Sequence, residues 1–257
     1  LLRYVAAEGG ARFARDLAGA PSDPREPGPI ADAVRRLQAD GLLRVELAAG
    51  ETIYLVLDEK RPVLDYHRNA VIHRFVAPAL LAAASRPGGT LDEVRARALW
   101  LSRLFKLEFM YRTGVPFGGV FEQNLAFFVR VGALSRVGDR LVPGAEPWTV
   151  SFLAEFVRAY LEAYRLTAET ALALLVGRNA AVDRKALAKE ALERGRAAFL
   201  SGGIALRESL SKAHVENALE WLVGEGIVAE SAGKLSVRDG GARVREIVDV
   251  IAPLLAS

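Results

Sequence analysis

The chain has 257 residues, 51% of them hydrophobic, which is enough for one large domain or a few small ones and excludes a disordered polypeptide. It has no cysteine, so disulfides and thiolate metal sites are excluded, and its three histidines are not spaced as in a zinc-binding helix. The net charge of +3 permits contact with phosphates or anionic lipid without requiring either, and no uninterrupted apolar run of about 18 residues predicts a membrane-spanning helix.

The N-terminal part predicts a helix, a loop, a second helix and a hairpin. Residues 1–20 have helical apolar spacing, residues 21–29 are rich in proline, and residues 30–40 form a second helical pattern. Gly41 stands at the expected end of that helix, and the stretches LLRVEL and TIYLVL then predict two short strands around a turn.

The segment from Leu64 to Ala84, LDYHRNAVIHRFVAPALLAAA, is the longest apolar stretch and predicts a buried helix around which other modules pack. Pro78 predicts a kink or the start of a second helix there. Polar side chains interrupt the apolar surface along two strips, and each needs a partner because an unpaired buried polar group costs about 1–3 kcal/mol. One strip holds Asp65, Arg68, Asn69 and His73, and the other holds His67 and Arg74.

Two interpretations of these polar residues stay open. The first is that His67 and His73 are buried and hydrogen-bonded; they lie on different helix faces, so this helix alone does not predict a shared metal. The second is that Arg68, Asn69 and His73 contact another domain or an anionic group. His214, in a later helix, is expected at the surface or as a cap.

A second unit of helices and a hairpin follows the central segment. Thr90 and Glu93 predict a capping box at the start of a helix that should extend to about Tyr111, and residues 113–119 predict a loop. The next helix is expected over residues 120–131, with Gly132 at its end and a hairpin after it.

A long helix is expected over about 149–176. Its aromatic residues recur every four positions, which predicts core packing, and Asp183 is the expected N-cap of a further helix to about Leu200. These aromatic residues are Phe152, Phe156, Tyr160 and Tyr164.

The third unit is a helix over 212–223, then Gly226 and a hairpin, and a helix over about 240–255 closes the chain. A helix, a terminating glycine and a hairpin therefore recur three times, which is the shape of a winged-helix module. We expect a mainly α fold: a helical region with three small β-hairpins in winged-helix-like modules. The expected modules are residues 1–58, 59–148 and 149–257.

Common catalytic and phosphate-binding motifs are missing from the sequence. G-x-G-x-x-G, G-x-x-x-x-G-K-[ST] and G-x-S-x-G are absent, and the glycine-rich stretch 114–119 lacks the preceding strand and the Lys-Ser of a phosphate loop. Adjacent carboxylates such as Asp92 and Glu93 face apart on a helix, so they do not predict a catalytic pair.

Winged helices often bind nucleic acid through the helix that precedes the hairpin, so the charges on these helices test that function. The first carries Arg35, Arg36 and Gln38, the second is mostly apolar, and the third is acidic, which is repulsive toward phosphates. Two of the three modules are therefore expected to serve protein interaction or packing. The acidic residues of the third helix and its end are Glu216, Glu220 and Glu225.

A family resemblance rests on the order of several segments. In the central segment, Tyr66, Arg68, Asn69, His73 and Pro78 occur in the order typical of the region downstream of the catalytic domain in bacterial membrane-bound (PlsB-type) glycerol-3-phosphate acyltransferases. His67 stands where that family commonly has an aromatic residue, and Ala70 where it often has asparagine. The later segments FLAEFVRAYLEAYRLTAETALALL, VDRKALAKEALERGRAAFLSGGI and AHVENALEWLVGEGIV also resemble that family, so the resemblance extends from about residue 55 to 230.

This resemblance implies an enzyme of phospholipid biosynthesis that acylates the first position of glycerol 3-phosphate, from acyl carrier protein or coenzyme A, at the cytoplasmic face of the inner membrane. Its chemistry would rest on a histidine general base with an aspartate five positions later. Here the fifth positions after the histidines are Ile72, Pro78 and Leu219, and the family's phosphate-binding motifs are missing as well. We therefore expect the non-catalytic C-terminal region of such an enzyme, and a chain that begins at Leu1 with Met110 as its only methionine fits a piece of a longer protein.

As such a region, the chain should be soluble and inactive by itself, with no catalytic residue, cofactor or metal of its own. Its expected partner is the catalytic acyltransferase domain of the same polypeptide, and Arg68, Asn69 and His73 are the candidates for interdomain or anion contacts. The membrane surface and acyl carrier protein are further candidate partners, while nucleic acid is not expected. The alternatives are a tandem winged-helix module that binds nucleic acid or protein, and a standalone enzyme whose site the sequence does not reveal.

Overall fold

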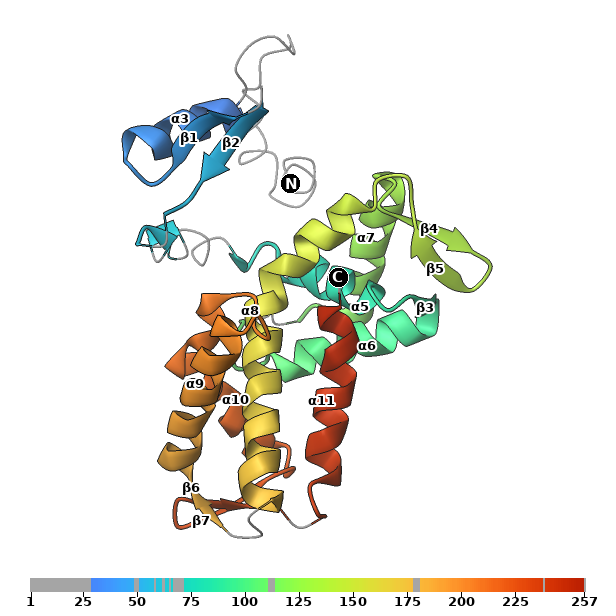
Figure 1. The fold of residues 1–257 in the computed structure, drawn as a ribbon. Coiled ribbons are helices and arrows are strands. Elements are labelled where there is room, and N and C mark those ends of the chain that lie inside the picture. Colours follow the sequence, from blue (N-terminus) through green and yellow to red (C-terminus); the bar gives the residue numbers. More distant parts are fainter. Residues whose placement is uncertain are drawn as a thin grey trace. The chain divides into compact units, whose positions relative to one another are not determined.

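The computed structural model describes residues 29–48, 51–57, 59–61, 63–64, 66, 72–110, 114–177, 181–237 and 239–256. The fold is mainly helical with three small antiparallel sheets, as predicted (Figure 1). The helix expected over 1–20, most of the proline-rich loop, and His67, Arg68 and Asn69 lie outside the described residues. The chain divides into two compact units, Leu1–Arg74 and Phe75–Ser257.

The described part of the first unit contains one helix and one hairpin. Helix α3 (Pro29–Ala39) begins with proline at its first position. The N–H of a residue at this position has no partner within the helix, so proline, which lacks it, is tolerated there. Gly41 has φ +67°, so it ends the helix in the left-handed conformation as predicted. Strands β1 (Arg44–Ala48) and β2 (Glu51–Leu55) pair antiparallel. None of the residues of this unit before Ile72 whose side chains are described is buried.

The second unit holds all remaining elements. Its first half contains α5 (Val76–Ser85), β3 (Gly89–Thr90), α6 (Leu91–Leu104), α7 (Phe117–Arg130), β4 (Leu134–Val137) and β5 (Arg140–Pro143). Its second half contains α8 (Trp148–Ala171), the π-helical turn η1 (Leu172–Val176), β6 (Val182–Asp183), α9 (Arg184–Leu200), the 3-10 turn η2 (Arg207–Leu210), α10 (Lys212–Gly224), β7 (Ala229–Ser231), β8 (Lys234–Ser236) and α11 (Ala242–Leu255).

Helix α8 is the element around which the second unit is packed. Figure 1 shows it in yellow with α5, α9, α10 and α11 beside it, and it contacts all four. Its buried aromatic residues Tyr160 and Tyr164 pack on Phe105, with ring centroids 5.9 and 5.3 Å away, whereas Phe152 at the other end of the predicted aromatic stripe is 43% exposed. Of the expected central helix over 64–84, the C-terminal part, α5, is buried as predicted, whereas Tyr66 is 74% exposed. The centre of the packing is α8, not this segment.

The segment 64–84 is interrupted by a turn at residues 73–75, and α5 then begins with Pro78 in its first turn, where proline breaks no helical bond. This is the second of the two outcomes predicted for Pro78. Two other helix boundaries differ from the sequence prediction. Helix α6 ends at Leu104 rather than near Tyr111, because the chain turns to bury Phe105 completely. Helix α7 begins at Phe117, so Gly118 and Gly119, which were expected in the preceding loop, are helical.

Among the described residues, the other predicted helix starts and the hairpins are confirmed. Thr90 and Glu93 form the capping box of α6, and the Asp183 carboxylate accepts hydrogen bonds from the N–H groups of Lys185 and Ala186 at the start of α9. Gly132 and Gly226 have φ +73° and +63° before the second and third hairpins.

Each of the later two hairpins gains a third strand that the sequence did not predict. The strand orders are β3-β5-β4 and β6-β8-β7, with two α-helices between the first strand and the hairpin in each case. The added strands β3 and β6 have two residues each, which is too short for an apolar alternation to be visible in a sequence. No helix in the described part of the chain is both long and apolar enough to cross a membrane.

Candidate functional site

Of the three contact residues predicted from the sequence, the structure describes only His73. It lies in the turn before α5 and its side chain is exposed, which differs from the buried, hydrogen-bonded histidine expected there. Arg68 and Asn69 lie outside the described residues, so a contact of this segment with another domain stays a prediction.

The sequence predicted His214 at the surface or as a cap. Its side chain is 20% exposed and forms one side of a polar contact between α10 and the segment after α6. Its Nδ1 lies 3.0 Å from Oε2 of Glu108, whose side chain is only 4% exposed, and its ring packs edge-on against Tyr160. The pair was not predicted because its members are 106 positions apart and Glu108 was expected inside a continuous helix. Within the described ranges no group of three or more possible metal ligands comes together.

The same face of α10 caps the end of α6. Trp221 donates its indole N–H to the carbonyl of Arg103 at 3.0 Å, and Asn217 donates to the carbonyl of Leu107 at 3.4 Å. Carbonyl groups in the last turn of a helix have no partner within the helix, so Trp221 supplies a bond that α6 cannot make itself. Asn217 supplies one to the segment after α6. An ion pair of 2.8 Å between Lys106 and Glu225 lies beside them.

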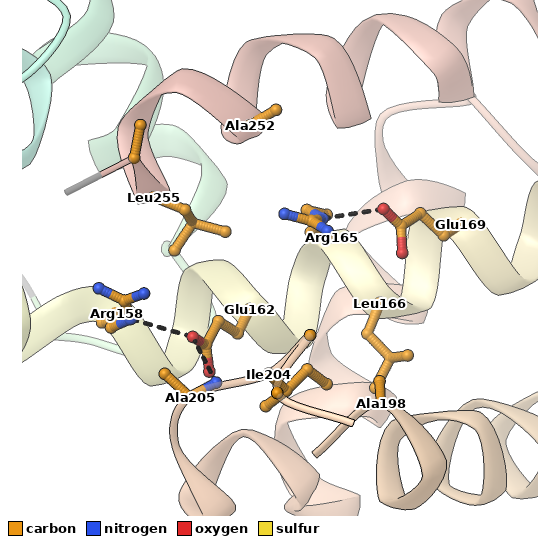
Figure 2. A pocket seen from close by; sticks show the side chains of 13 residues that line it. Arg158, Glu162, Arg165, Leu166, Glu169, Ala198, Ile204, Ala205, Ala252 and Leu255 are labelled. Carbon is orange, nitrogen blue, oxygen red and sulfur yellow. Dashed lines mark hydrogen bonds and ion pairs between the residues drawn. The ribbon is translucent and has the colours of Figure 1, made fainter. Parts of the chain in front are cut away.

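A groove of about 320 Å³ lies between α8, the loop after α9 and the last turn of α11 (Figure 2). The side chains of Leu166, Ile204 and Leu255 form its apolar wall, and two charge pairs from α8 line the other side. The charged residues are Arg158, Glu162, Arg165 and Glu169.

Glu162 anchors the loop after α9 onto α8. Its carboxylate is 5% exposed and accepts hydrogen bonds from the N–H groups of Ala205 and Leu206, at 3.1 Å each, and from the hydroxyl of Ser209 at 2.7 Å. Nε of Arg158 donates a fourth bond at 3.0 Å. A buried charge is tolerated when it is paired and fully hydrogen-bonded, and Glu162 meets that condition.

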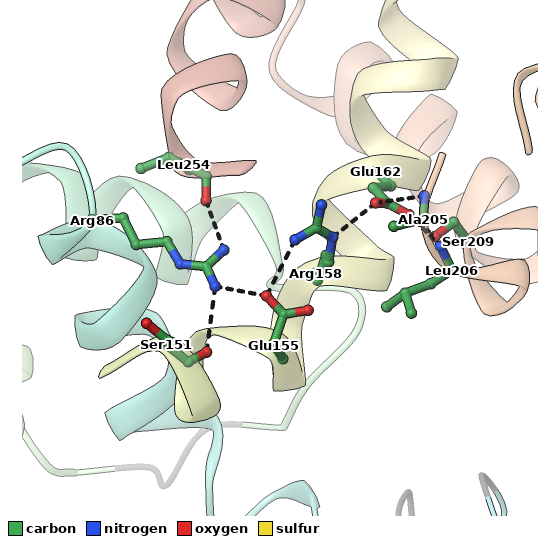
Figure 3. A network of polar contacts seen from close by, with 9 residues as sticks. All are labelled: Arg86, Ser151, Glu155, Arg158, Glu162, Ala205, Leu206, Ser209 and Leu254. Atoms are coloured by element: carbon green, nitrogen blue, oxygen red, sulfur yellow. Dashed lines mark hydrogen bonds and ion pairs between the residues drawn. The ribbon is translucent and has the colours of Figure 1, made fainter. Parts of the chain in front are cut away.

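A relay of alternating charges extends from Glu162 to the ends of α5 and α11 (Figure 3). Arg158 also donates to Glu155, and Glu155 accepts from Arg86 at 2.6 Å. Arg86, which follows α5, donates in addition to the backbone carbonyls of Ser151 at the start of α8 and of Leu254 in α11. Although burial by itself lowers the pKa of Arg158, its bonds to Glu162 and the nearby charge of Glu155 outweigh burial and raise that pKa above its usual value.

The relay and the Glu162 anchor join four separate parts of the second unit: the end of α5, helix α8, the loop after α9 and the end of α11. Their carboxylates are engaged by N–H and O–H donors, an arrangement suited to holding elements in place. Sequence reasoning missed this cluster, although one signal was present, since Glu155, Arg158 and Glu162 are spaced three and four residues apart within an otherwise aromatic and aliphatic stretch.

Comparison with known proteins gives one family. A family model described as the glycerol-3-phosphate acyltransferase C-terminal region matches residues 3–231. A search of curated proteins found no match to the chain.

Proposed function

Because the chain belongs to the glycerol-3-phosphate acyltransferase C-terminal region family, we propose that it is a non-catalytic part of a glycerol-3-phosphate 1-O-acyltransferase and that it braces the catalytic domain of the same polypeptide. The match over residues 3–231 is the observation that carries this proposal. The whole enzyme would then act in phospholipid biosynthesis as a peripheral protein at the cytoplasmic face of the membrane.

The polar chemistry of the chain supports a bracing role. Glu162 and Glu155 are bound by donors that fix them in place, so they serve as acceptors that hold helices together. In the sequence, no histidine is followed at the fifth position by aspartate, the arrangement that the resemblance associates with the general base.

We assign the contact with the catalytic domain to the segment that contains Arg68, Asn69 and His73. His73 is exposed, so its imidazole is available to a partner surface. Guanidinium, amide and imidazole groups together donate to carboxylates and backbone carbonyls, which are abundant on any domain surface. The membrane surface and acyl carrier protein are the further partners that such a region would help the enzyme to meet.

The direct test of the non-catalytic role is an acyltransferase assay with the purified 257-residue chain. Glycerol 3-phosphate is supplied with acyl-CoA or acyl carrier protein thioester, and release of free thiol is followed. We expect no turnover from this chain, while the full-length enzyme in the same assay gives a clear rate. Turnover by the chain alone would contradict the proposal.

A second test measures docking. The separately produced catalytic domain is titrated with the chain carrying His73→Leu, and Lys189→Leu on the exposed side of α9 is the matched control. Loss of a hydrogen bond to a partner group should weaken binding about tenfold for His73→Leu and leave the control unchanged. Equal affinities for the two variants would remove His73 from the proposed interface.

The runner-up function is a tandem winged-helix module that binds nucleic acid or another protein. The strand orders β3-β5-β4 and β6-β8-β7, each with two α-helices between the first strand and the hairpin, favour this module type. For nucleic acid the third module is unsuited, because His214, Asn217 and Trp221 of α10 contact the end of α6 and the segment after it, and the remaining charges there are largely acidic. A gel shift at low salt that disappears steeply as salt is raised would favour the runner-up.

A further inference from the structure

The three hairpins follow their preceding helices in the same way. Helices α3, α7 and α10 end at Ala39, Arg130 and Gly224, each two positions before a glycine with positive φ, and a hairpin comes directly after that glycine. The hairpin of the first unit is therefore built into the same local arrangement as the two hairpins of the second unit. The three glycines are Gly41, Gly132 and Gly226.

The two later hairpins each have a third strand at nearly the same interval before the glycine. Strands β3 and β6 pair antiparallel with the first two residues of the second hairpin strand, and each ends at the N-cap residue of the next helix, Thr90 or Asp183. Thr90 lies 42 positions before Gly132 (132 − 90), and Asp183 lies 43 positions before Gly226 (226 − 183). The same interval counted back from Gly41 falls two or three residues before Leu1, and a helix that begins there agrees with the helix expected over residues 1–20.

The third strand also fixes the start of a helix against the tip of the hairpin. Leu91, the first residue of α6, donates its N–H to the carbonyl of Asp139 at 2.7 Å, and Arg184, the first residue of α9, donates to Gly233 at 3.0 Å. In both cases the acceptor is the residue directly before the second hairpin strand. The polypeptide that enters each of these arrangements is therefore held by backbone hydrogen bonds.

The outer edge of β2 is the place where an equivalent strand would pair in the first unit. Within the part of the chain that the structure describes, β2 pairs only with β1 (Figure 1). Ile53, Tyr54 and Leu55 are 41%, 56% and 36% exposed, and β2 has no charged residue or proline after Glu51. Exposed edge strands are ordinarily protected by charged side chains, proline or a bulge, so an apolar edge of this kind indicates one that another strand covers.

We propose that the polypeptide directly upstream of Leu1 forms a third strand on the outer edge of β2, antiparallel to it and followed at once by the helix expected over residues 1–20. This inference rests on the function proposed above, in which the upstream polypeptide carries the catalytic domain of the same enzyme. The connection to the catalytic domain then enters a β-sheet instead of passing through a flexible linker. A connection held by backbone hydrogen bonds suits a region that braces its neighbour.

The test is amide hydrogen exchange, followed by NMR, in the 257-residue chain and in the same chain extended through the residues that precede Leu1 in its parent polypeptide. The β2 N–H groups that point away from β1 should exchange about tenfold or more slowly in the extended chain, because they gain hydrogen bonds. The N–H groups of β5 should exchange equally in both proteins and serve as the internal reference.

Two variants of the extended chain locate the strand. Proline at the second, third and fourth residues before Leu1 should abolish the added protection, since proline has no N–H to donate to a neighbouring strand. Proline at three residues further upstream is the matched control and should leave the protection in place. The β2 N–H groups that bond to β1 should stay protected in both variants, which shows that the hairpin remains folded.

Equal exchange at the β2 edge in the extended and the 257-residue proteins would overturn the proposed strand. Slow exchange of the same groups already in the 257-residue chain would also overturn it, because residues within that chain would then cover the edge. Neither result touches the acyltransferase assay, in which turnover by the 257-residue chain would contradict the proposed function itself.

Discussion

At the scale of single residues, Glu162 is the clearest case of a charge that the fold accommodates by using all of its acceptor positions. The carboxylate lies on a helix whose neighbouring side chains are buried and mostly apolar, yet it has two backbone donors, one hydroxyl donor and one guanidinium donor. Desolvating an unpaired carboxylate would cost several kcal/mol, so a buried charge at this position requires the four donors. The residue therefore acts as a fixed point for the loop after α9.

Replacement of Glu162 by glutamine tests this interpretation. In glutamine an NH₂ group replaces one carboxylate oxygen and cannot accept the two hydrogen bonds that this oxygen accepts. The buried donors of these bonds are then left without a partner. We expect the free energy of unfolding in urea to fall by about 1–3 kcal/mol. The matched control is Glu193→Gln on α9, whose pair with Lys189 is exposed and should contribute less than about 0.5 kcal/mol. Equal losses for the two variants would contradict the role of Glu162.

Glu93 should give α6 a defined dependence on pH. Its pKa is lowered from the ordinary value of 4.5, first because the backbone N–H of Thr90 donates to the carboxylate, and further because the Thr90 side chain bonds it and Arg97 and Arg140 lie nearby. A lowered folded-state pKa means that the stabilisation is complete above pH 4.5 and is lost as pH falls through the lowered pKa.

The measurement for Glu93 is urea unfolding at neutral and at acidic pH. Glu93→Gln should lose less stability on acidification than the unmodified chain, because the variant has no proton to take up at this position. Glu122→Gln, on the exposed side of α7, serves as the control for removing a carboxylate. If the acid-induced loss is the same in Glu93→Gln and the unmodified chain, the capping carboxylate is not the group responsible.

At the scale of elements, α9 and α8 approach each other closely at a glycine. A methyl group placed on Gly195 would lie 2.5 Å from a methyl carbon of Leu210 and 2.7 Å from one of Leu166, so there is no room for it without movement. Gly119 in α7 is also helical, but a methyl group there would meet nothing within 4 Å. An added side chain therefore meets a steric obstacle at Gly195 and none at Gly119.

Alanine substitution at these two glycines should have opposite effects. Gly119→Ala should raise the free energy of unfolding by about 0.5–1 kcal/mol, since alanine favours the helix and meets no obstacle. Gly195→Ala should lower it by about 1–2 kcal/mol, because crowding against Leu166 and Leu210 exceeds the gain in helix propensity. Thermal or urea unfolding of both variants measures the difference, and a gain at Gly195 would show that the two helices can separate without penalty.

Local sequence patterns predicted the helices and hairpins of this fold well, but they did not predict the contacts between these elements. Capping residues such as Thr90 and Asp183 act within three positions of themselves, so their spacing is visible in the sequence. The end of α6 depends on the burial of Phe105 against α8, and the Glu108–His214 pair joins distant segments, so neither leaves a periodic signal. The relay from Arg86 to Glu162 was missed for the same reason.

At the scale of the whole molecule, the second unit contains the core. All the fully buried large side chains belong to residues from Leu81 onward, and none of the residues before Ile72 whose side chains are described is buried. The folding of the second unit should therefore depend on its own apolar surface. The predicted division into three modules stays a prediction, while the compact unit that begins at Phe75 contains the last two hairpins.

A fragment of residues 75–257 should fold by itself. We expect its circular dichroism to report a helical protein and its urea midpoint to lie close to that of the corresponding transition in the full chain. The control is a fragment that begins at Leu91 and so lacks α5, which packs directly on α8 and should be required for stability. A midpoint for residues 75–257 as low as that of the shorter fragment would contradict an independent second unit.

The anchoring of the loop by Glu162 also decides where foreign sequence can be tolerated. The stretch around Gly202 is exposed and rich in glycine, so it looks like a convenient place for an epitope tag or a fluorophore. One added residue between Gly203 and Ala205 would slide two amides off the carboxylate that holds them. The exposed turn at Gly138 is the better insertion point for labelling this protein, on the N-terminal side of Asp139, whose carbonyl accepts a hydrogen bond from the N–H of Leu91 at 2.7 Å.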